Sequence, residues 1–202
     1  MKCIGRLVAV ALWAVAMPVI MVASTITFDT GLSNENPISS PYEGLDWDNF
    51  YALNGATYSG NPSGYQNGMV SEPFVAYNAN AGPAAFSSAS PFDFNSVYLT
   101  GAWNDDLHIR VQGYLGATLL YDNTVVVNAA APTLFNFNYL DIDRVLFTSS
   151  DGINHGYNGS GEHFVMDDLT INAAVPEPAS FLLLAAGLAA LLVCARRRKP
   201  TA

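Results

Sequence analysis

Aromatic side chains gather in a part of the sequence that is poor in regular structure, and their type suits carbohydrate binding. This part, residues 31–85, holds five prolines and turn pairs such as Asn54-Gly55 and Asn67-Gly68. Loops can hold side chains open to a ligand, where an aromatic ring packs against a sugar ring. The candidate ligand-binding residues are Tyr42, Trp47, Tyr51, Tyr58 and Tyr65. The alternative is that these rings pack on a half-buried sheet.

Catalytic signatures are missing from the sequence. It contains no Gly-x-Ser-x-Gly nucleophile elbow and no His-Glu-x-x-His zinc motif. Glycoside hydrolysis would need two carboxylates facing each other, but the acids are so numerous that many arbitrary pairs exist, and no pair indicates this activity. His108 falls on a predicted solvent face and His155 and His163 flank a glycine-rich loop, so a surface role is expected for all three. We predict no catalytic residues, with a secreted polysaccharide-acting hydrolase as an alternative.

Charge is distributed unevenly along the chain. Of 17 acidic residues all but Glu177 lie in residues 25–174, where Arg110 and Arg144 are the only bases, so that region has a formal charge of about −14. A nucleic-acid binder needs a clustered basic face to displace counterions from phosphates. The charge therefore excludes a nucleic-acid partner of the usual kind, and also a polybasic lipid-binding surface on this region.

Short alternating apolar runs dominate residues 25–174, and long helical periodicity is absent. The clearest run is 107–112, in which alternation places Leu107, Ile109 and Val111 in the core and His108, Arg110 and Gln112 toward solvent. Other strands are expected at 25–28, 96–100, 117–121, 124–127, 133–137, 143–148 and 164–171. Their spacing predicts an all-β fold, an antiparallel β-sandwich. Residues 31–85 are expected to form short strands on long loops, and 149–162 an irregular glycine-rich loop, while Trp103, which ends an apolar strand, is expected in the core.

Both ends of the chain have the layout of targeting segments. Lys2 and Arg6 precede an apolar run over 7–20 and small residues up to Ser24, which predicts a secretory signal peptide at residues 1–24. The alternative is a permanent signal anchor, although the run is shorter than the roughly 20 residues of a full span. Cys3 and Cys194 lie in the end segments, so the exported region, residues 25–174, holds no cysteine and must rely on its core.

A second apolar run, 181–195, is followed by a basic cluster and preceded by two prolines that keep Glu177 extended and accessible. The positive-inside rule places the cluster in the cytoplasm and the exported region outside the inner membrane. The order resembles the PEP-CTERM sorting signal of exopolysaccharide-producing bacteria, over residues 175–202. The residues that carry the resemblance are Pro176, Glu177, Pro178, Arg196, Arg197, Arg198 and Lys199, around a single transmembrane helix.

That resemblance implies a partner, a location and a setting. An exosortase, a membrane-embedded cysteine transpeptidase-like enzyme, is expected to cut near Pro-Glu-Pro. The protein would then be anchored in the inner membrane before processing and reach the cell surface or the extracellular matrix afterwards. We therefore predict a non-catalytic binding or adhesion module that associates with exopolysaccharide in a biofilm. A purely structural surface protein is a further alternative.

The exported region is also similar to central regions of uncharacterised PEP-CTERM proteins, through residues 42–50, 101–105 and 164–171. Its closing strand resembles jelly-roll carbohydrate-binding modules, which implies a jelly-roll-like sandwich. Such modules commonly hold one structural calcium between the first and last strands. By that resemblance Asp29, with Asp167 or Asp168, would be its ligands, and hard carboxylate oxygens suit calcium. The alternative is that these acids only solvate the surface.

Overall fold

The computed structural model describes residues 23–173. The predicted signal peptide, apart from its last two residues, and the predicted sorting segment at 175–202 with its transmembrane helix lie outside the described residues. Across residues 23–173, no helix combines the length and the apolar character that crossing a membrane requires.

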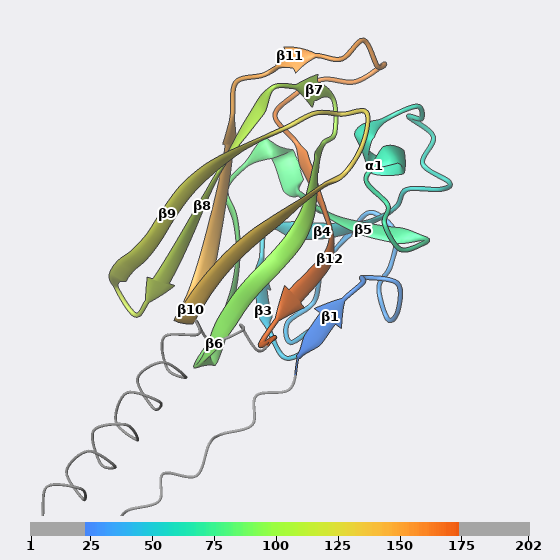
Figure 1. Ribbon diagram of the computed structural model, residues 1–202. Coiled ribbons are helices and arrows are strands. Elements are labelled where there is room, and N and C mark those ends of the chain that lie inside the picture. The colour runs from blue at the N-terminus through green and yellow to red at the C-terminus, as the bar shows by residue number, and fades with distance from the viewer. Residues whose placement is uncertain (1–22, 174–202) are drawn as a thin grey trace, which may run out of the picture.

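Strands make up nearly all of the regular structure between residues 23 and 173 (Figure 1). The long strands are β6 (Ala84–Gly101), β8 (Leu107–Leu115), β9 (Thr118–Val127), β10 (Thr133–Ser150) and β12 (Phe164–Ile171). The shorter elements are β1 (Ser24–Ile26), β2 (Asn36–Pro37), β3 (Asp46–Asp48), β4 (Phe50–Asn54), α1 (Gly64–Asn67), β5 (Phe74–Asn78), η1 (Ala79–Ala81), β7 (Asn104–Asp105) and β11 (Ile153–Asn154).

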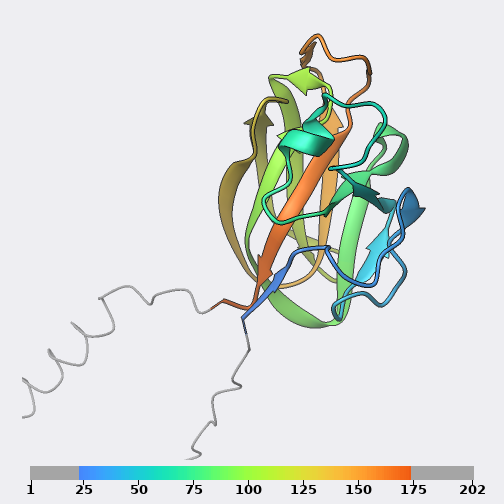
Figure 2. The same ribbon diagram turned by 90° about the vertical axis from the view of Figure 1, so that its right-hand side faces the viewer.

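Pairing is antiparallel throughout, in the order β2-β4-β5-β12-β6-β10-β8-β9. β6 and β10 run through both layers of the fold, because their two halves have different partners (Figure 2). The first half of β6 pairs with β3 and the second half with β12. One layer therefore contains β3, β8 and β9, and the other contains β2, β4, β5 and β12. The predicted antiparallel β-sandwich is confirmed.

Aromatic rings fill the space between the layers. Phe50 of β4 lies 5.9 Å, between ring centroids, from Phe147 of β10, and Phe147 lies 5.7 Å from Phe164 of β12. All three rings are buried, and edge-to-face pairs such as Phe50–Phe147 add to the stabilisation from burial. Both hydrophobic clusters of the structure are drawn from residues 26–171, so the exported region supplies its own core.

The strands expected at 117–121 and 124–127 are one strand, β9, and those expected at 133–137 and 143–148 are one strand, β10. β10 stays continuous through bulges, with register shifts on both sides of Tyr139 and positive φ angles at Asn138 (50°) and Asp141 (55°). Such bulges let a strand bend from one layer to the other without ending. Because the residues at the bulges are polar, the sequence alone suggested a turn between two strands at this place.

The run 107–112 behaves as predicted at five of its six positions. Leu107, Ile109 and Val111 are buried, and His108 and Arg110 are exposed. Gln112 is buried instead, because its amide donates to Asp122 on β9, which also accepts from Arg110. A hydrogen-bonded neighbour therefore covers this polar side chain on the outer face.

Candidate functional site

The structure divides the five predicted aromatic residues between two places. Tyr42 and Trp47 belong to the main core, where Trp47 is 8% exposed. Tyr58 and Tyr65 belong to a second cluster, and Tyr51 lies beside it, with its ring next to that of Tyr77, a member of that cluster. A single platform built from all five rings therefore does not form.

Trp47 is a core residue and not an open loop residue. Its ring centroid lies 5.5 Å from those of Phe28 and Phe50, and its indole N–H donates to the carbonyl oxygen of Tyr42 at 3.0 Å. The short strand β3 pairs with β6, with Trp47 opposite Phe86, and this pairing turns the ring inward. The prediction that Trp47 is held open to a ligand is corrected for this reason.

Three half-buried tyrosines and one carboxylate form what we call the tyrosine patch, defined as Glu35, Tyr51, Tyr58 and Tyr77. Tyr51 of β4 and Tyr77 of β5 are directly paired, with ring centroids 6.0 Å apart. Side chains two residues apart along a strand share a face, and their neighbours Phe50 and Ala52 point into the main core. The two rings therefore lie on the outer face of the sheet.

Tyr65 and Trp103 support the patch from below. Tyr65 is 4% exposed and its ring centroid lies 5.2 Å from Tyr58, 5.3 Å from Tyr77 and 5.4 Å from Trp103. Trp103 is 5% exposed, which confirms its predicted place in a core. Burial raises the pKa of Tyr65 far above its ordinary value. Tyr65 thus packs beneath the surface rings and is not itself open to a ligand.

The turn of helix α1 that carries Tyr65 is fixed by its N-cap and by close packing. The Ser63 hydroxyl accepts from the backbone N–H of Gln66. At Gly64 an added Cβ would lie only 1.8 Å from the carbonyl oxygen of Gly101. Only glycine permits this approach, so the turn sits directly on the end of β6 and holds Tyr65 against Trp103.

Glu35 reaches the patch from the turn before β2. Its backbone N–H donates to the carbonyl oxygen of Ala52 at 2.8 Å, which places the turn alongside β4. Burial first, and then the negative charge of Glu35, raises the pKa of both Tyr58 and Tyr77. The backbone bond to Ala52 thus places Glu35 beside the strand that carries Tyr51, and its negative charge acts on two phenols from different segments.

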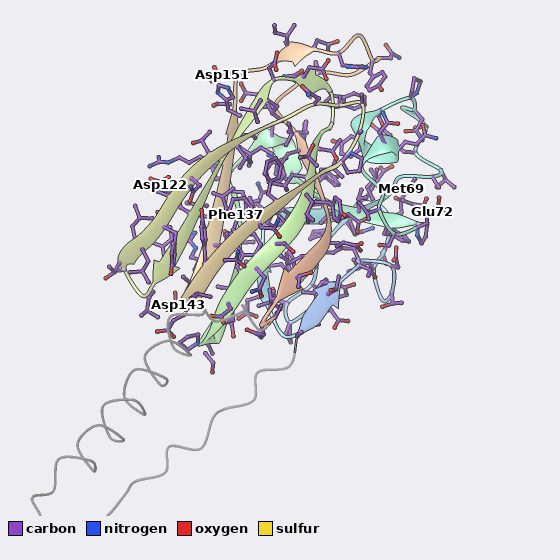
Figure 3. The ribbon with its side chains drawn as sticks, in the orientation of Figure 1. Met69, Glu72, Asp122, Phe137, Asp143 and Asp151 are labelled. Atoms are coloured by element: carbon purple, nitrogen blue, oxygen red, sulfur yellow. The ribbon has the colours of Figure 1, made fainter. Side chains whose placement is uncertain are left out.

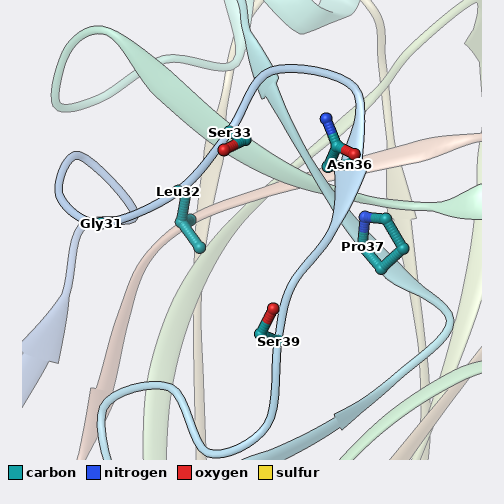
Figure 4. A pocket seen from close by; sticks show the side chains of 6 residues that line it. All are labelled: Gly31, Leu32, Ser33, Asn36, Pro37 and Ser39. Atoms are coloured by element: carbon teal, nitrogen blue, oxygen red, sulfur yellow. The ribbon is translucent and has the colours of Figure 1, made fainter.

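A hollow of about 300 Å³ lies in the same segment of chain as Glu35 (Figure 4). Its lining is mostly polar and comes from both sides of Glu35 in the sequence: Gly31, Leu32, Ser33, Asn36, Pro37 and Ser39.

Figure 3 shows Met69, which packs against the second cluster, on the side of the molecule away from Asp122 on β9.

Asp29 and Asp167, two of the three predicted calcium ligands, accept hydrogen bonds from backbone N–H groups. Asp167 is fully buried and accepts from the N–H groups of Val70 (2.7 Å), Ser71 (3.0 Å) and Asp168 (2.8 Å). Asp29 accepts from the N–H of Phe74 at 3.2 Å. Asp167 therefore ties the segment between α1 and β5 to the last strand, and Asp29, which follows β1, binds the first residue of β5.

This donor set does not fit a calcium ion. Calcium needs six to eight oxygen ligands, whereas the hydrogens of three N–H groups point at the Asp167 carboxylate. The Asp168 Oδ1 atom is buried without a hydrogen-bond partner among the described residues, but it is a single oxygen. Within residues 23–173 no group of three or more His, Cys, Asp or Glu side chains is placed to hold a metal.

Each of the three histidines contacts a different part of the structure. The Nδ1 atom of His155 lies 2.6 Å from a carboxylate oxygen of Asp105, and that of His108 lies 3.4 Å from Asp151. The ring of His163 lies 6.3 Å from Tyr77, at the border of the tyrosine patch. His108 is exposed as predicted, while the other two are half-buried in hydrogen bonds that hold loops together.

Tyr77 is the residue of the patch that the sequence analysis missed, and Glu35 was not singled out either. Residues 31–85 were expected to be mainly loops, yet β4 and β5 pair over five residues each. The run Phe74-Val75-Ala76-Tyr77 is rich in aromatic and β-branched residues, which is a strand signal. The nearby prolines and turn pairs favoured a loop, so this strand signal was not given weight.

Comparisons with known proteins give a match to a sorting motif and a likeness to a solved structure. Residues 174–199 match the PEP-CTERM protein-sorting motif. No curated protein matches the chain. A solved structure described as TmCBM61 in complex with β-1,4-galactotriose has a TM-score of 0.34 and 10% identity, covering 67% of this chain and 97% of that one. With the PEP-CTERM sorting signal at its C-terminal end, the chain is an exported surface protein of the kind that an exosortase sorts, anchored through that end before processing.

Proposed function

We propose that the exported region is a non-catalytic polysaccharide-binding module of the extracellular matrix, and that the tyrosine patch is its binding surface. The observation that carries this proposal is the pairing of Tyr51 with Tyr77 on an outer sheet face, with Tyr58 beside them. Exopolysaccharide in a biofilm is the proposed partner, because it is the polymer that a matrix protein meets after sorting.

The chemistry of the patch suits a sugar polymer. A pyranose ring has one face of C–H groups and a rim of hydroxyls, so it packs on an aromatic ring while its rim needs hydrogen-bond partners. A tyrosine supplies both, through its ring face and its hydroxyl. Two paired strands hold Tyr51 and Tyr77 in place, so little side-chain entropy is lost when a ligand binds.

The rigid support beneath the patch favours binding by a preformed surface. Tyr65 and Trp103 are both buried and contact each other edge to face at 5.4 Å, and Tyr65 packs against both Tyr58 and Tyr77. A preformed surface of a few aromatic rings is typical of binding modules with modest affinity, which gain strength when many copies meet one polymer.

The proposal is tested with the protein comprising residues 23–173, which contains both hydrophobic clusters. Its co-sedimentation with purified exopolysaccharide of the producing organism is expected to saturate. Released reducing ends, measured in the same tubes, are expected to stay at background, and their increase would favour the hydrolase alternative. Absence of binding at any concentration would contradict the proposal and favour a purely structural surface protein.

A further inference from the structure

The charge around the tyrosine patch is of one sign. Both basic residues of the described chain, Arg110 on β8 and Arg144 on β10, lie in the layer that also contains β9. Arg110 is in addition paired with Asp122. The strands that build the patch, β2, β4 and β5, carry no basic residue, and a backbone hydrogen bond from Glu35 to Ala52 holds Glu35 beside β4, the strand that carries Tyr51.

We infer that the tyrosine patch selects a cationic sugar, namely a polymer of amino sugars with free amino groups, whose ammonium group pairs with Glu35 while its ring packs on Tyr51 and Tyr77. This inference rests on the proposed function and narrows it to one class of polysaccharide. Uronate-rich polymers are disfavoured, because their carboxylates would meet Glu35 and a region with a formal charge of about −14.

Two interactions favour the ammonium group at this place. The face of a tyrosine ring attracts a cation through its quadrupole, and a nearby carboxylate adds a direct ion pair. Tyr58 and Tyr77 keep their protons at neutral pH, since burial and then Glu35 raise the pKa of both phenols. Glu35 is thus the source of charge within the patch itself.

Three oligosaccharides of equal length test the inference by calorimetry with residues 23–173. A β-1,4-linked glucosamine hexamer is the cationic probe, the fully N-acetylated hexamer is its neutral counterpart, and a galacturonic acid hexamer is the anionic one. We expect the cationic hexamer to bind about tenfold more tightly than the neutral one, with an affinity that falls as salt rises. No detectable binding of the anionic hexamer is expected.

Glu35→Gln is expected to weaken binding of the cationic hexamer about three- to fivefold and to leave the neutral hexamer unchanged. Glu43→Gln is the matched control: this exposed residue loses the same charge, but its carboxylate acts on Tyr42 and not on the patch. Equal losses in both variants would overturn the inference, because they would show attraction to the whole acidic surface.

The failure of the inference can be told apart from the failure of the proposed function. Equal binding of the cationic and neutral hexamers, lost in Tyr51→Ala, would overturn the charge selection and leave polysaccharide binding in place. Tighter binding of the galacturonic acid hexamer would also overturn the selection. No binding of any hexamer or of the native polymer would overturn both.

Discussion

The carboxylate of Asp167, on the last strand, accepts a 2.7 Å hydrogen bond from the backbone N–H of Val70, 97 residues earlier in the chain. The same carboxylate accepts from Ser71 and from Asp168, and the Ser71 hydroxyl lies 3.3 Å from it. One buried side chain therefore fastens the segment that links α1 to β5, the two elements that carry Tyr65 and Tyr77 of the second aromatic cluster.

Removal of this carboxylate is expected to destabilise the protein strongly. In Asp167→Ala three backbone N–H groups lose their acceptor, which costs about 3 kcal/mol in the free energy of unfolding. Urea-induced unfolding of residues 23–173 measures the loss. Asp46→Ala, at an exposed position on β3, serves as the control and is expected to change stability by less than about 0.5 kcal/mol. Similar losses of unfolding free energy in the two variants would show that Asp167 contributes no more to stability than an exposed acid.

Asp167 also predicts how stability depends on pH. Burial raises its pKa from 3.8 to about 7, although its N–H donors act in the opposite direction. The folded protein therefore holds this proton more tightly than the unfolded chain, and the stabilisation is full below about pH 4. It declines as pH rises from 4 to 7, by at most about 1.4 kcal/mol per pH unit.

Asp167→Asn isolates this dependence, because an amide does not titrate. The free energy of unfolding of the variant is expected to fall less steeply between pH 4 and pH 7 than that of the unchanged protein. Every other acid is the same in both proteins, so the difference between the two curves belongs to position 167. Two parallel curves would mean that Asp167 ionises alike in the folded and unfolded chains.

Calcium is expected to leave stability unchanged. Asp167 and Asp29 already accept hydrogen bonds from backbone N–H groups, so a cation would have to displace those donors. The melting temperature of residues 23–173 should be the same in millimolar calcium and in chelator, since a ligand that binds the folded state must raise it. A rise of several degrees with calcium would restore the site that the resemblance to jelly-roll modules implied.

Tyr51 and Trp47 are expected to respond in opposite ways to truncation. Trp47→Ala empties a place in the main core and should cost about 3–5 kcal/mol of stability. Tyr51→Ala removes a half-buried surface ring and should lower polysaccharide affinity about three- to tenfold at a much smaller cost in stability. Thermal melts and co-sedimentation separate the two effects. Unchanged affinity in Tyr51→Ala would remove this ring from the binding surface.

Much of the fold follows from the alternation of apolar residues. The strand expected at 164–171 is β12 with the same bounds, and the run 107–112 lies within β8 with its apolar side chains buried. The positions of the strands were easier to predict than the points at which one strand ends and the next begins. β10 crosses from one layer to the other through bulges at Asn138 and Asp141, and a polar bulge inside a strand has the same composition as a turn between strands.

The sequence predicted the type of residue that forms the candidate site, but it did not predict which residues of that type lie in it. Tyr51 and Tyr58 were singled out because tyrosines in a proline-rich segment suit ligand binding, and the structure brings them to one surface. Trp47 and Tyr65 have the same composition around them but are buried, because β3 pairs with β6 and α1 packs on Gly101. Which face of a short strand points inward depends on its partner, and the partner is far away in the sequence.

The sequence by itself indicated an exported protein of the kind that an exosortase sorts, because the sorting motif at residues 174–199 is a short linear pattern. Its composition also determined the class of the exported region, a cysteine-free and acidic β-protein. Only the tertiary structure decided the tyrosine patch. Glu35, Tyr51, Tyr58 and Tyr77 come from four separate segments, and strand register together with the buried layer of Tyr65 and Trp103 brings their side chains to one face.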